Sequence, residues 1–401
     1  MLNELELFHV RTALIQAFLR ERKLDGVLLT RPDNFAMATG GKRNYIWTHT
    51  DLGANALFVH HDGRVAFVGN NIEEPRLHDE ELGTLGTAFH SYLWFEGNAA
   101  ACVKSHYTGT FASDDGSLGE NIHGAMAGLR ALLTETELEK YRQLGKLAAA
   151  AMEATLASIR RGDKEADIAA RLVAEGVKRR CEVPVALIAA DGRIPKYRHP
   201  LPTVAPLLDN GGLTEQTVDR YVMVVGCFLR EGLVVSLTRF AKVAELTREL
   251  EERFVRICAV DALMQEATQP GQTLGEVFAA CQRAYADQGF SPNEWHNHHQ
   301  GGATGYAGRT AKGTPGEKFP VLDTIWPEKA AEILGKEVAF GAAFAWNPSG
   351  PGVKSEDTFI LLPDGTQEIV SSTPALPIVD LKLALGRATK VRKSGISAYA
   401  D

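Results

Sequence analysis

The sequence predicts an α/β protein with two domains, and three observations support this prediction. The chain has 401 residues, enough for two hydrophobic cores. Helical and strand patterns alternate over about the first 130 residues, as in an α/β domain. Beyond that point two helical regions resemble each other, and strand-like runs follow each of them. We therefore expect one domain over residues 1–130 and a second over 131–401.

The first domain is predicted from four segments in chain order. A long amphipathic stretch ends at Gly26 and predicts a helix, and "GVLLT" follows it as a buried strand before the loop "RPDN". The run "NALFVHHDGRVAFVGN" predicts two strands around a turn at Asp62 and Gly63. "NNIEEPRLHDEEL" then suits a helix. This order predicts an α/β domain with a mixed sheet.

The second domain shows an internal duplication. Residues 152–176 and 260–289 share one plan, a helix, a turn centred on Gly162 or Gly271, and a second helix. The two glycines lie about 110 residues apart, too far for a solenoid repeat. This spacing indicates two half-domains that pack about a pseudo-twofold axis. A site between the halves would take residues from both.

Composition argues against several classes of function. The formal charge is −7, and no long run of Lys or Arg suggests a nucleic-acid groove or a membrane surface. No apolar run approaches the roughly 18 residues of a membrane span, and the N-terminus is unlike a cleaved signal. The five cysteines are scattered without a C-x-x-C pair, which indicates reduced thiols. We expect a cytoplasmic protein.

The stretch "EWHNHHQGGATGYAGRT" is the densest group of chemically active residues. His296, His298 and His299 fall within four positions, and a glycine pair follows them. In an extended strand, His296 and His298 would share one face and His299 the other. The glycine-rich continuation allows close backbone approach, although a plain tight loop explains it equally well. The cluster is a metal site or an acid–base site, depending on which carboxylates join it.

Five segments in order resemble the creatinase, aminopeptidase P, prolidase and methionine aminopeptidase family, whose catalytic domain has the pita-bread fold. They are "YRHPLPT", "GLVVSLTRF", "HHQGG", "AWNPSGPG" and "KSEDTFIL". Residues 1 to about 130 resemble the N-terminal domain of creatinase. The resemblance implies an α/β (α+β) protein, a creatinase-type N-terminal domain followed by a pita-bread domain with pseudo-twofold symmetry.

The peptidases of this family hold two divalent metals with two Asp, one His and two Glu. At three of those positions the resemblance places Val225, Ser236 and Asn347, and only His299 and Glu356 remain. Valine cannot bind a hard cation, and one His with one carboxylate cannot hold a stable dinuclear centre. We therefore predict no metal centre and no cofactor.

Creatinase is the family's example of chemistry without a metal. The resemblance places its acid–base histidine at His199. The carboxylates that hold its cationic substrate are missing, because Thr238 and Asn347 stand at two of their positions. The acid–base residue thus matches creatinase, but the carboxylates that bind the guanidinium group of its substrate do not. Creatine is therefore not the expected substrate.

The predicted catalytic residues are His199, His299, Glu356 and Tyr306. A neutral imidazole suits proton transfer near neutral pH, although a loop histidine bonded to backbone is the structural alternative. Glu356 would orient His299, with the adjacent Asp357 facing the other way, and the Tyr306 phenol would donate to a developing oxyanion. The predicted substrate-binding residues are Arg198, Arg309, His298, Asn347, Trp346 and Ser236.

These residues predict a metal-independent, creatinase-like hydrolase. It would cleave a C–N bond, amide or amidine, in a small polar metabolite or short peptide. The alternatives are an Xaa-Pro-type metallo-dipeptidase or aminopeptidase, a lyase or isomerase on the same scaffold, and a non-catalytic peptide-binding module. We expect no nucleic-acid or membrane partner. We expect a homodimer in which residues 34–50 approach the partner's site.

Overall fold

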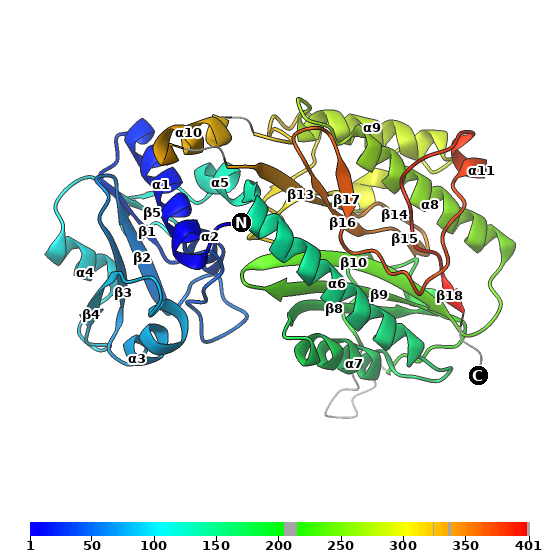
Figure 1. Cartoon of the computed structure of the whole chain (residues 1–401). Coiled ribbons are helices and arrows are strands. Elements are labelled where there is room, and N and C mark those ends of the chain that lie inside the picture. Colours follow the sequence, from blue (N-terminus) through cyan, green and yellow to red (C-terminus); the bar gives the residue numbers. More distant parts are fainter. Residues whose placement is uncertain (204–214, 324, 336–337, 399–401) are drawn as a thin grey trace.

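The computed structural model describes residues 1–203, 215–323, 325–335 and 338–398. A sheet and its helices form the N-terminal end of the molecule, and a larger body of two main sheets, one two-stranded sheet and long helices forms the rest (Figure 1). Within the described ranges, none of the helices combines the length and apolarity that a bilayer crossing requires.

The N-terminal sheet is mixed, as predicted, with strand order β4-β3-β2-β1-β5-β6. Antiparallel pairs join β1, β2 and β3, whereas β4, β5 and β6 pair parallel to their neighbours. The strands are β1 Gly26–Leu29, β2 Asn55–His60, β3 Val65–Asn70, β4 Ala88–Tyr92, β5 Phe111–Ser113 and β6 Glu120–Asn121. The helices of this part are α1 Glu4–Arg22, α2 Pro32–Thr39, α3 Glu74–Arg76 and α4 Ala99–His106, with a π-helix at Leu77–Leu82.

Two local signals decide the ends of these helices. Asn3 and Glu6 form a capping box that starts α1, and the helix ends at Lys23, which adopts the left-handed conformation. The segment "RPDN", predicted as a loop, instead opens α2. Pro32 stands at the first helical position, where its fixed φ favours the helix and its missing N–H costs nothing.

The first half of the pita-bread body contains α6 and α7 followed by three antiparallel strands. The turn between the helices carries Gly162 at φ +87°, a conformation that favours glycine. The bounds are α6 Glu135–Ala157, α7 Glu165–Lys178, β8 Glu182–Ala190, β9 Tyr221–Arg230 and β10 Leu233–Lys242. This is the predicted order of helix, turn, helix and strands, and α6 crosses the face of the sheet in Figure 1.

The second half repeats this plan. Gly271, at φ +84°, separates α8 from α9, and a second antiparallel sheet follows with order β12-β11-β13-β16-β17. The bounds are α8 Arg248–Ala267, α9 Leu274–Asp287, β11 Gly301–Thr304, β12 Ala311–Lys312, β13 Phe340–Trp346, β16 Asp357–Leu361 and β17 Gln367–Ile369. The remaining elements are α5 Ala127–Ala131, β7 Leu133–Thr134, α10 Ile325–Leu334, β14 Ser349–Gly350, β15 Val353–Lys354, α11 Lys382–Leu385 and β18 Ser397–Ala398.

The two halves meet where β10 runs beside the start of β16. The backbone N–H of Thr238 donates to the carbonyl of Glu356 at 3.2 Å, and the Ser236 N–H donates to Thr358 Oγ1 at 2.9 Å. Most side chains of these strands are apolar and buried, so the polar groups at this junction lie within a largely apolar core. Glu356 and the residues around it therefore lie at the seam between the two halves.

Candidate active site

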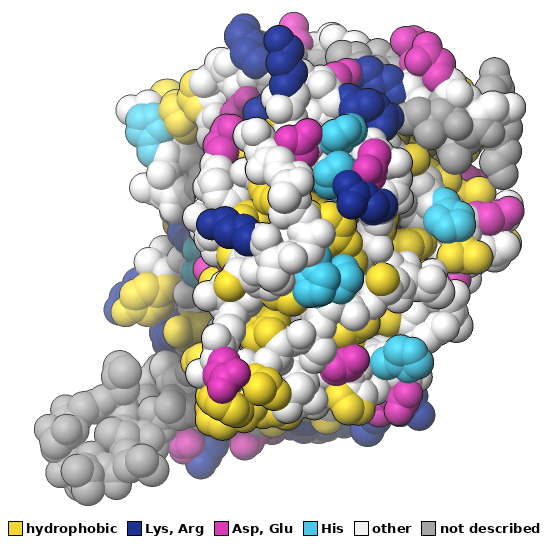
Figure 2. Space-filling model, turned by 90° about the vertical axis from the view of Figure 1, so that its left-hand side faces the viewer, with side chains coloured by type: hydrophobic (Ala, Val, Ile, Leu, Met, Phe, Trp, Pro, Cys, Tyr) yellow, Lys and Arg dark blue, Asp and Glu magenta, His cyan; other side chains and the backbone are white. Residues whose placement is uncertain are grey.

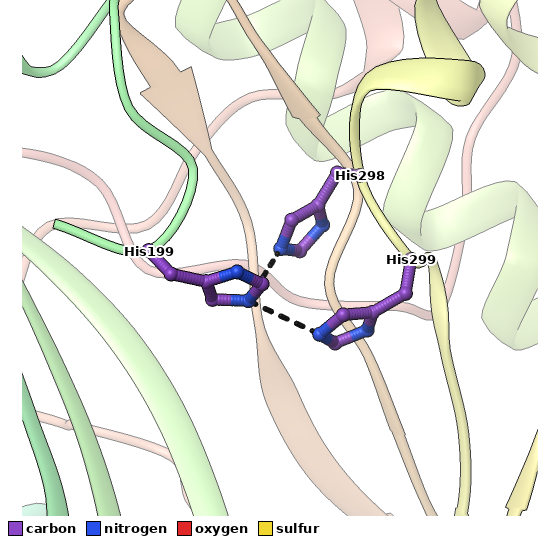
Figure 3. A group of neighbouring side chains, drawn as sticks. All are labelled: His199, His298 and His299. Atoms are coloured by element: carbon purple, nitrogen blue, oxygen red, sulfur yellow. Dashed lines mark hydrogen bonds between the residues drawn. The ribbon is translucent and has the colours of Figure 1, made fainter.

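Three imidazoles from the two halves converge on one point (Figure 3). His199 lies in the loop after β8 and its short 3-10 helix Asp191–Arg193, and His298 and His299 lie just before β11. The Nε2 atom of His199 is 3.1 Å from Nε2 of His299 and 3.2 Å from Nε2 of His298. The segment 298–299 is not a regular strand, so the expectation that these two side chains face opposite ways is wrong. Both contact His199.

Arg198 holds the two histidine loops together. Its guanidinium donates to Glu294 Oε1 at 2.6 Å and to the carbonyl of Gly350 at 2.7 Å. Glu294 belongs to the 3-10 helix Glu294–Asn297 that precedes His298. Arg198 therefore positions His199 against the other histidines, and its donors are used within the protein rather than free for the substrate.

Gln300 and Gly301 fix the far side of the cluster. The Gln300 amide donates to the backbone carbonyls of His298 at 2.6 Å and Trp295 at 2.9 Å. Gly301 has φ +96°, and a Cβ there would lie 2.2 Å from the carbonyl oxygen of Ala345 on β13. Only glycine lets the chain pass so close to β13. The "HHQGG" sequence therefore sets where the imidazoles point.

The imidazoles are neutral at physiological pH. Burial, Arg309 and the neighbouring His199 lower the pKa of His299 to about 4. Burial and the positive field of Lys354 lower the pKa of His298, which is only 7% exposed, still further. Burial and Lys354 also lower the pKa of His199, although Glu356 opposes them. Each ring therefore has an unprotonated nitrogen at neutral pH.

Glu356 lies next to this cluster, held by two cations and two neutral donors. Lys354 Nζ lies 3.5 Å from Oε2, and Arg309 lies 3.3 Å from Oε1. The Thr238 hydroxyl donates to Oε2 at 2.7 Å, and the Asn347 amide donates to Oε1 at 3.3 Å. Burial alone would raise the pKa of Glu356, but Lys354 and Arg309 with these two donors lower it to about 2. The carboxylate is charged at neutral pH.

Asp357 faces a different set of partners. Its Oδ1 accepts from Arg239 at 2.6 Å, and Lys393 lies 3.6 Å from its Oδ2. All three side chains are almost fully buried. Neighbouring carboxylates in an extended chain point to opposite sides, so Asp357 belongs to a structural charge network and Glu356 to the histidine side.

The residues present do not fit the dinuclear metal centre of the family's peptidases. Val225 is buried in β9 opposite Thr238, and the Ser236 hydroxyl lies 3.2 Å from the Cys227 sulfur. The Asn347 amide already binds Glu356. Val225 offers no ligand atom, the other two are neutral, and two cationic side chains hold the remaining carboxylate. Two divalent ions need carboxylates that this site does not supply.

A single ion is a separate possibility for the three histidines. The Nε2 distances from His199 to His299 and His298, 3.1 and 3.2 Å, are close to the roughly 3.3 Å edge of a tetrahedron with metal–nitrogen bonds of about 2.05 Å, and the three ligand atoms all lie within 4.8 Å of one another. Three imidazoles with one open position form a known zinc arrangement. The positive charges of Lys354 and Arg309 repel such a dication. The same charges disfavour protonation of the imidazole rings.

Two predicted site residues lie elsewhere. The Tyr306 hydroxyl donates to Glu137 on α6, and Arg11 lies over its ring at 5.4 Å. Tyr306 is 2% exposed, so it joins α1 to the body and cannot donate to an oxyanion beside His199. Trp346 is fully buried, and its indole N–H donates to Thr268 Oγ1 at 2.9 Å. Trp346 is a core residue rather than a pocket wall.

Ser236 and Lys354 also differ from the sequence prediction. Ser236 is 1% exposed, and its contacts with Cys227 and Thr358 make it part of the seam rather than a substrate-binding group. Lys354 was not predicted, although it stands two residues before Glu356 in "KSED". Side chains two apart in an extended segment share a face, and this spacing was the available signal for an ion pair.

Comparisons with known proteins agree with this fold. Residues 139–319 match the model of metallopeptidase family M24. No match was found among curated proteins. The chain is similar in structure to a dipeptidase PepE from Mycobacterium ulcerans, with a TM-score of 0.70, 15% identity and full coverage of both chains.

Two further solved structures show how widely the fold occurs. A prolidase from Pyrococcus horikoshii OT3 has a TM-score of 0.68 at 13% identity, covering 90% of this chain and 98% of that one. The N-terminal domain of the FACT complex subunit SPT16 from Cicer arietinum has a TM-score of 0.63 at 9% identity, covering 95% and 99%. Identities this low show the fold and not the activity. Residues 139–319 therefore carry the sequence pattern of metallopeptidase family M24, and the chain has the pita-bread fold of these dipeptidase and prolidase structures.

Proposed function

We propose that this protein is a metal-independent hydrolase that cleaves a C–N bond, amide or amidine, in a small polar molecule. The single observation that carries the proposal is the convergence of three neutral imidazoles beside a buried, charged Glu356. His199 and His299 are exposed to solvent, so water and substrate can reach them. The ring nitrogens are unprotonated at neutral pH, and His199, whose pKa burial and Lys354 lower and Glu356 raises, supplies the general base.

His199 is the residue best placed to transfer protons. Its Nε2 is shared between two other imidazoles, and a neutral imidazole has one lone pair for an incoming proton. In the proposed reaction His199 takes a proton from water as the oxygen attacks the carbon of the C–N bond. It then gives that proton to the departing nitrogen as the C–N bond breaks. Glu356 offsets the positive charge that forms on His199 between these steps.

Measurement of C–N hydrolysis with and without metals tests this proposal. A panel of dipeptides, N-acyl amino acids, ureido acids, guanidino acids and cyclic amidines is incubated with the protein in EDTA, and released amine or ammonia is measured. We expect turnover that persists in EDTA and falls by about 10²–10⁴-fold in His199→Asn. His78→Asn, which changes an exposed histidine, should leave the rate unchanged. Turnover that needs added metal and survives His199→Asn contradicts the proposal.

A second candidate function is a hydrolase with one metal ion on His199, His298 and His299. The spacing of the three Nε2 atoms favours it. Such an ion would supply a bound hydroxide as the nucleophile, and Glu356 would lie nearby. The two candidates differ in what EDTA does to turnover, so the same experiment separates them.

A further inference from the structure

The C-terminal segment, residues 371–398, carries a buried lysine back to the body. The segment follows β17, and its last strand β18 pairs in parallel with the end of β10. Lys393 lies in this segment and is 2% exposed, although Arg392 beside it is exposed. A buried ammonium group needs counter-charges, because burial of an unpaired charge is very unfavourable. The partners of Lys393 therefore show what this part of the segment does.

Lys393 joins two buried carboxylates that come from different elements. Its Nζ lies 2.7 Å from Asp261 Oδ2 on α8 and 3.6 Å from Asp357 Oδ2 on β16. Asp261 is 1% exposed and Asp357 is 3% exposed. Arg239 donates to Asp357 Oδ1 at 2.6 Å and to the carbonyl of Glu356 at 3.0 Å. Two cations thus balance two anions, and one of the cations comes from the C-terminal segment.

The same two carboxylates hold the residues on either side of Glu356. The Ser355 hydroxyl donates to Asp261 Oδ2 at 2.6 Å, and Asp357 directly follows Glu356 in the chain. Alternate side chains of an extended segment face opposite sides. Contacts that fix residues 355 and 357 on one side therefore direct Glu356 to the other side, where the histidines lie. This arrangement depends on the pair of carboxylates that Lys393 balances.

We propose that Lys393 is a positioning residue for the active site, and that it holds Glu356 in place through the residues on either side of it. The assignment rests on the proposed hydrolase function, in which Glu356 offsets the charge that forms on His199. Lys393 touches neither the substrate nor the histidines in this proposal. The C-terminal segment is then a part of the site, because it supplies the charge that keeps residues 355–357 buried in register.

Loss of the ammonium group should change the surroundings of the histidines. Two buried carboxylates would share one cation, and removal of one partner from a buried ion pair is strongly unfavourable. A cavity of about 160 Å³ beside Lys393 and Asp357 can admit water to the unpaired carboxylate, so the segment can shift without unfolding. The Glu356 carboxylate acts electrostatically on the rings of His199 and His299. A shift of Glu356 therefore changes the electric field at both rings.

Nuclear magnetic resonance of the histidine rings tests the assignment without turnover. The full chain is labelled in histidine and measured in EDTA at one fixed pH, and His199→Asn and His299→Asn assign the two signals. In Lys393→Met we expect the signals of both rings to shift from their wild-type positions. The signal of His78, an exposed histidine of the N-terminal domain, should stay in place. Lys393→Arg keeps the charge and should restore the wild-type signals.

A second lysine of the same segment provides the matched control. Lys390 is exposed and lies three residues before Lys393, so Lys390→Met should leave all the ring signals unchanged. A folded Lys393→Met variant with lower stability but unmoved His199 and His299 signals overturns the proposal, because the lysine would then only stabilise the fold. Equal shifts in Lys393→Met and Lys390→Met, or in Lys393→Met and Lys393→Arg, also overturn it.

A double variant covers the case in which Lys393→Met does not fold. Lys393→Met/Asp261→Asn removes one buried charge of each sign and leaves Asp357 with Arg239. Circular dichroism shows whether each variant is folded. Shifted ring signals in the double variant support the proposal and unmoved signals overturn it. If the signals shift but no C–N hydrolysis is found, Lys393 remains a positioning residue for the cluster and the proposed hydrolase is wrong.

Discussion

The Nε2 atoms of His199 and His299 lie 3.1 Å apart although 100 residues separate them in the chain. One belongs to each half of the duplicated body, and the Arg198–Glu294 ion pair joins the loops that carry them. A third ring, His298, approaches the same nitrogen at 3.2 Å. Three acceptor-capable nitrogens so close together need a shared proton, a water or a metal ion between them, and the predictions below distinguish these states.

The first prediction concerns metal content. The purified chain should contain far less than one Mn, Co or Zn ion after dialysis, because Val225, Ser236 and Asn347 supply no carboxylate. Elemental analysis measures this. Two ions per chain retained through dialysis would contradict the predicted loss of the dinuclear centre. One retained zinc ion that is lost in His298→Ala would instead support the mononuclear candidate.

Sequence patterns were enough to predict the fold and part of the site. The duplicated helix–glycine–helix plan around Gly162 and Gly271 appears in the structure with both glycines at positive φ. That feature is local, because turn chemistry and helical periodicity depend on neighbouring residues. The resemblance also pointed to His199, His299 and Glu356, and the structure brings His199 and His299 together.

The residues that were misplaced depend on contacts far along the chain. Tyr306 follows the histidines closely, yet its hydroxyl binds Glu137, 169 residues away. Trp346 stands beside Asn347, but neighbours on a strand face opposite sides, so one contacts Thr268 and the other Glu356. Lys354 was missed because its importance comes from burial next to Glu356, and spacing alone does not show burial.

The second prediction concerns stability. Glu356→Gln should lower the free energy of unfolding by about 3–5 kcal/mol, because it leaves the buried Lys354 and the half-buried Arg309 without their counter-charge. Urea denaturation followed by circular dichroism measures this change. Glu252→Gln is the control, since it breaks an exposed pair with Arg248 and should cost less than about 1 kcal/mol. Equal losses in the two variants would mean that the Glu356 ion pairs are not a stabilising unit.

The third prediction concerns pH. His299 has a folded-state pKa of about 4, and an unfolded histidine titrates near 6.5. Between these values the unfolded state binds more protons, so stability should fall as pH falls from about 6.5 towards 4. Glu356 adds to the loss only below its unfolded pKa of about 4.3.

Denaturation at pH 7.5 and pH 5 measures this dependence. His298, whose pKa burial and Lys354 also lower, contributes in the same direction. His298→Asn should therefore lose less stability between the two pH values than the wild type does. His78→Asn removes an exposed histidine and should keep the wild-type dependence. A His298→Asn variant with the full wild-type loss would show that the cluster is not held neutral by its surroundings.

The fourth prediction concerns assembly. We expect a homodimer in which part of residues 34–50 approaches the partner's site. Asn34 and Asn44 are fully buried and bonded within their own chain, so they are not the contacting residues. Ile46 and Trp47 are 64% and 72% exposed, an unusual position for large apolar side chains. The face of the molecule drawn in Figure 2 carries interspersed charged side chains of both signs. Ile46 and Trp47 offer an apolar contact, which is the better candidate for a dimer interface.

Light scattering on the full chain at micromolar concentration measures the assembly. The wild-type protein should have the mass of a dimer, and Trp47→Glu should shift it towards the monomer, because the variant places a charge in the contact. Trp94→Glu changes another exposed tryptophan, 61% exposed on the same N-terminal sheet region, and should leave the dimer intact. A monomeric wild type would end the idea that a neighbouring chain completes the site. A dimer that survives Trp47→Glu but not Trp94→Glu would move the contact from residues 34–50 to the segment after β4.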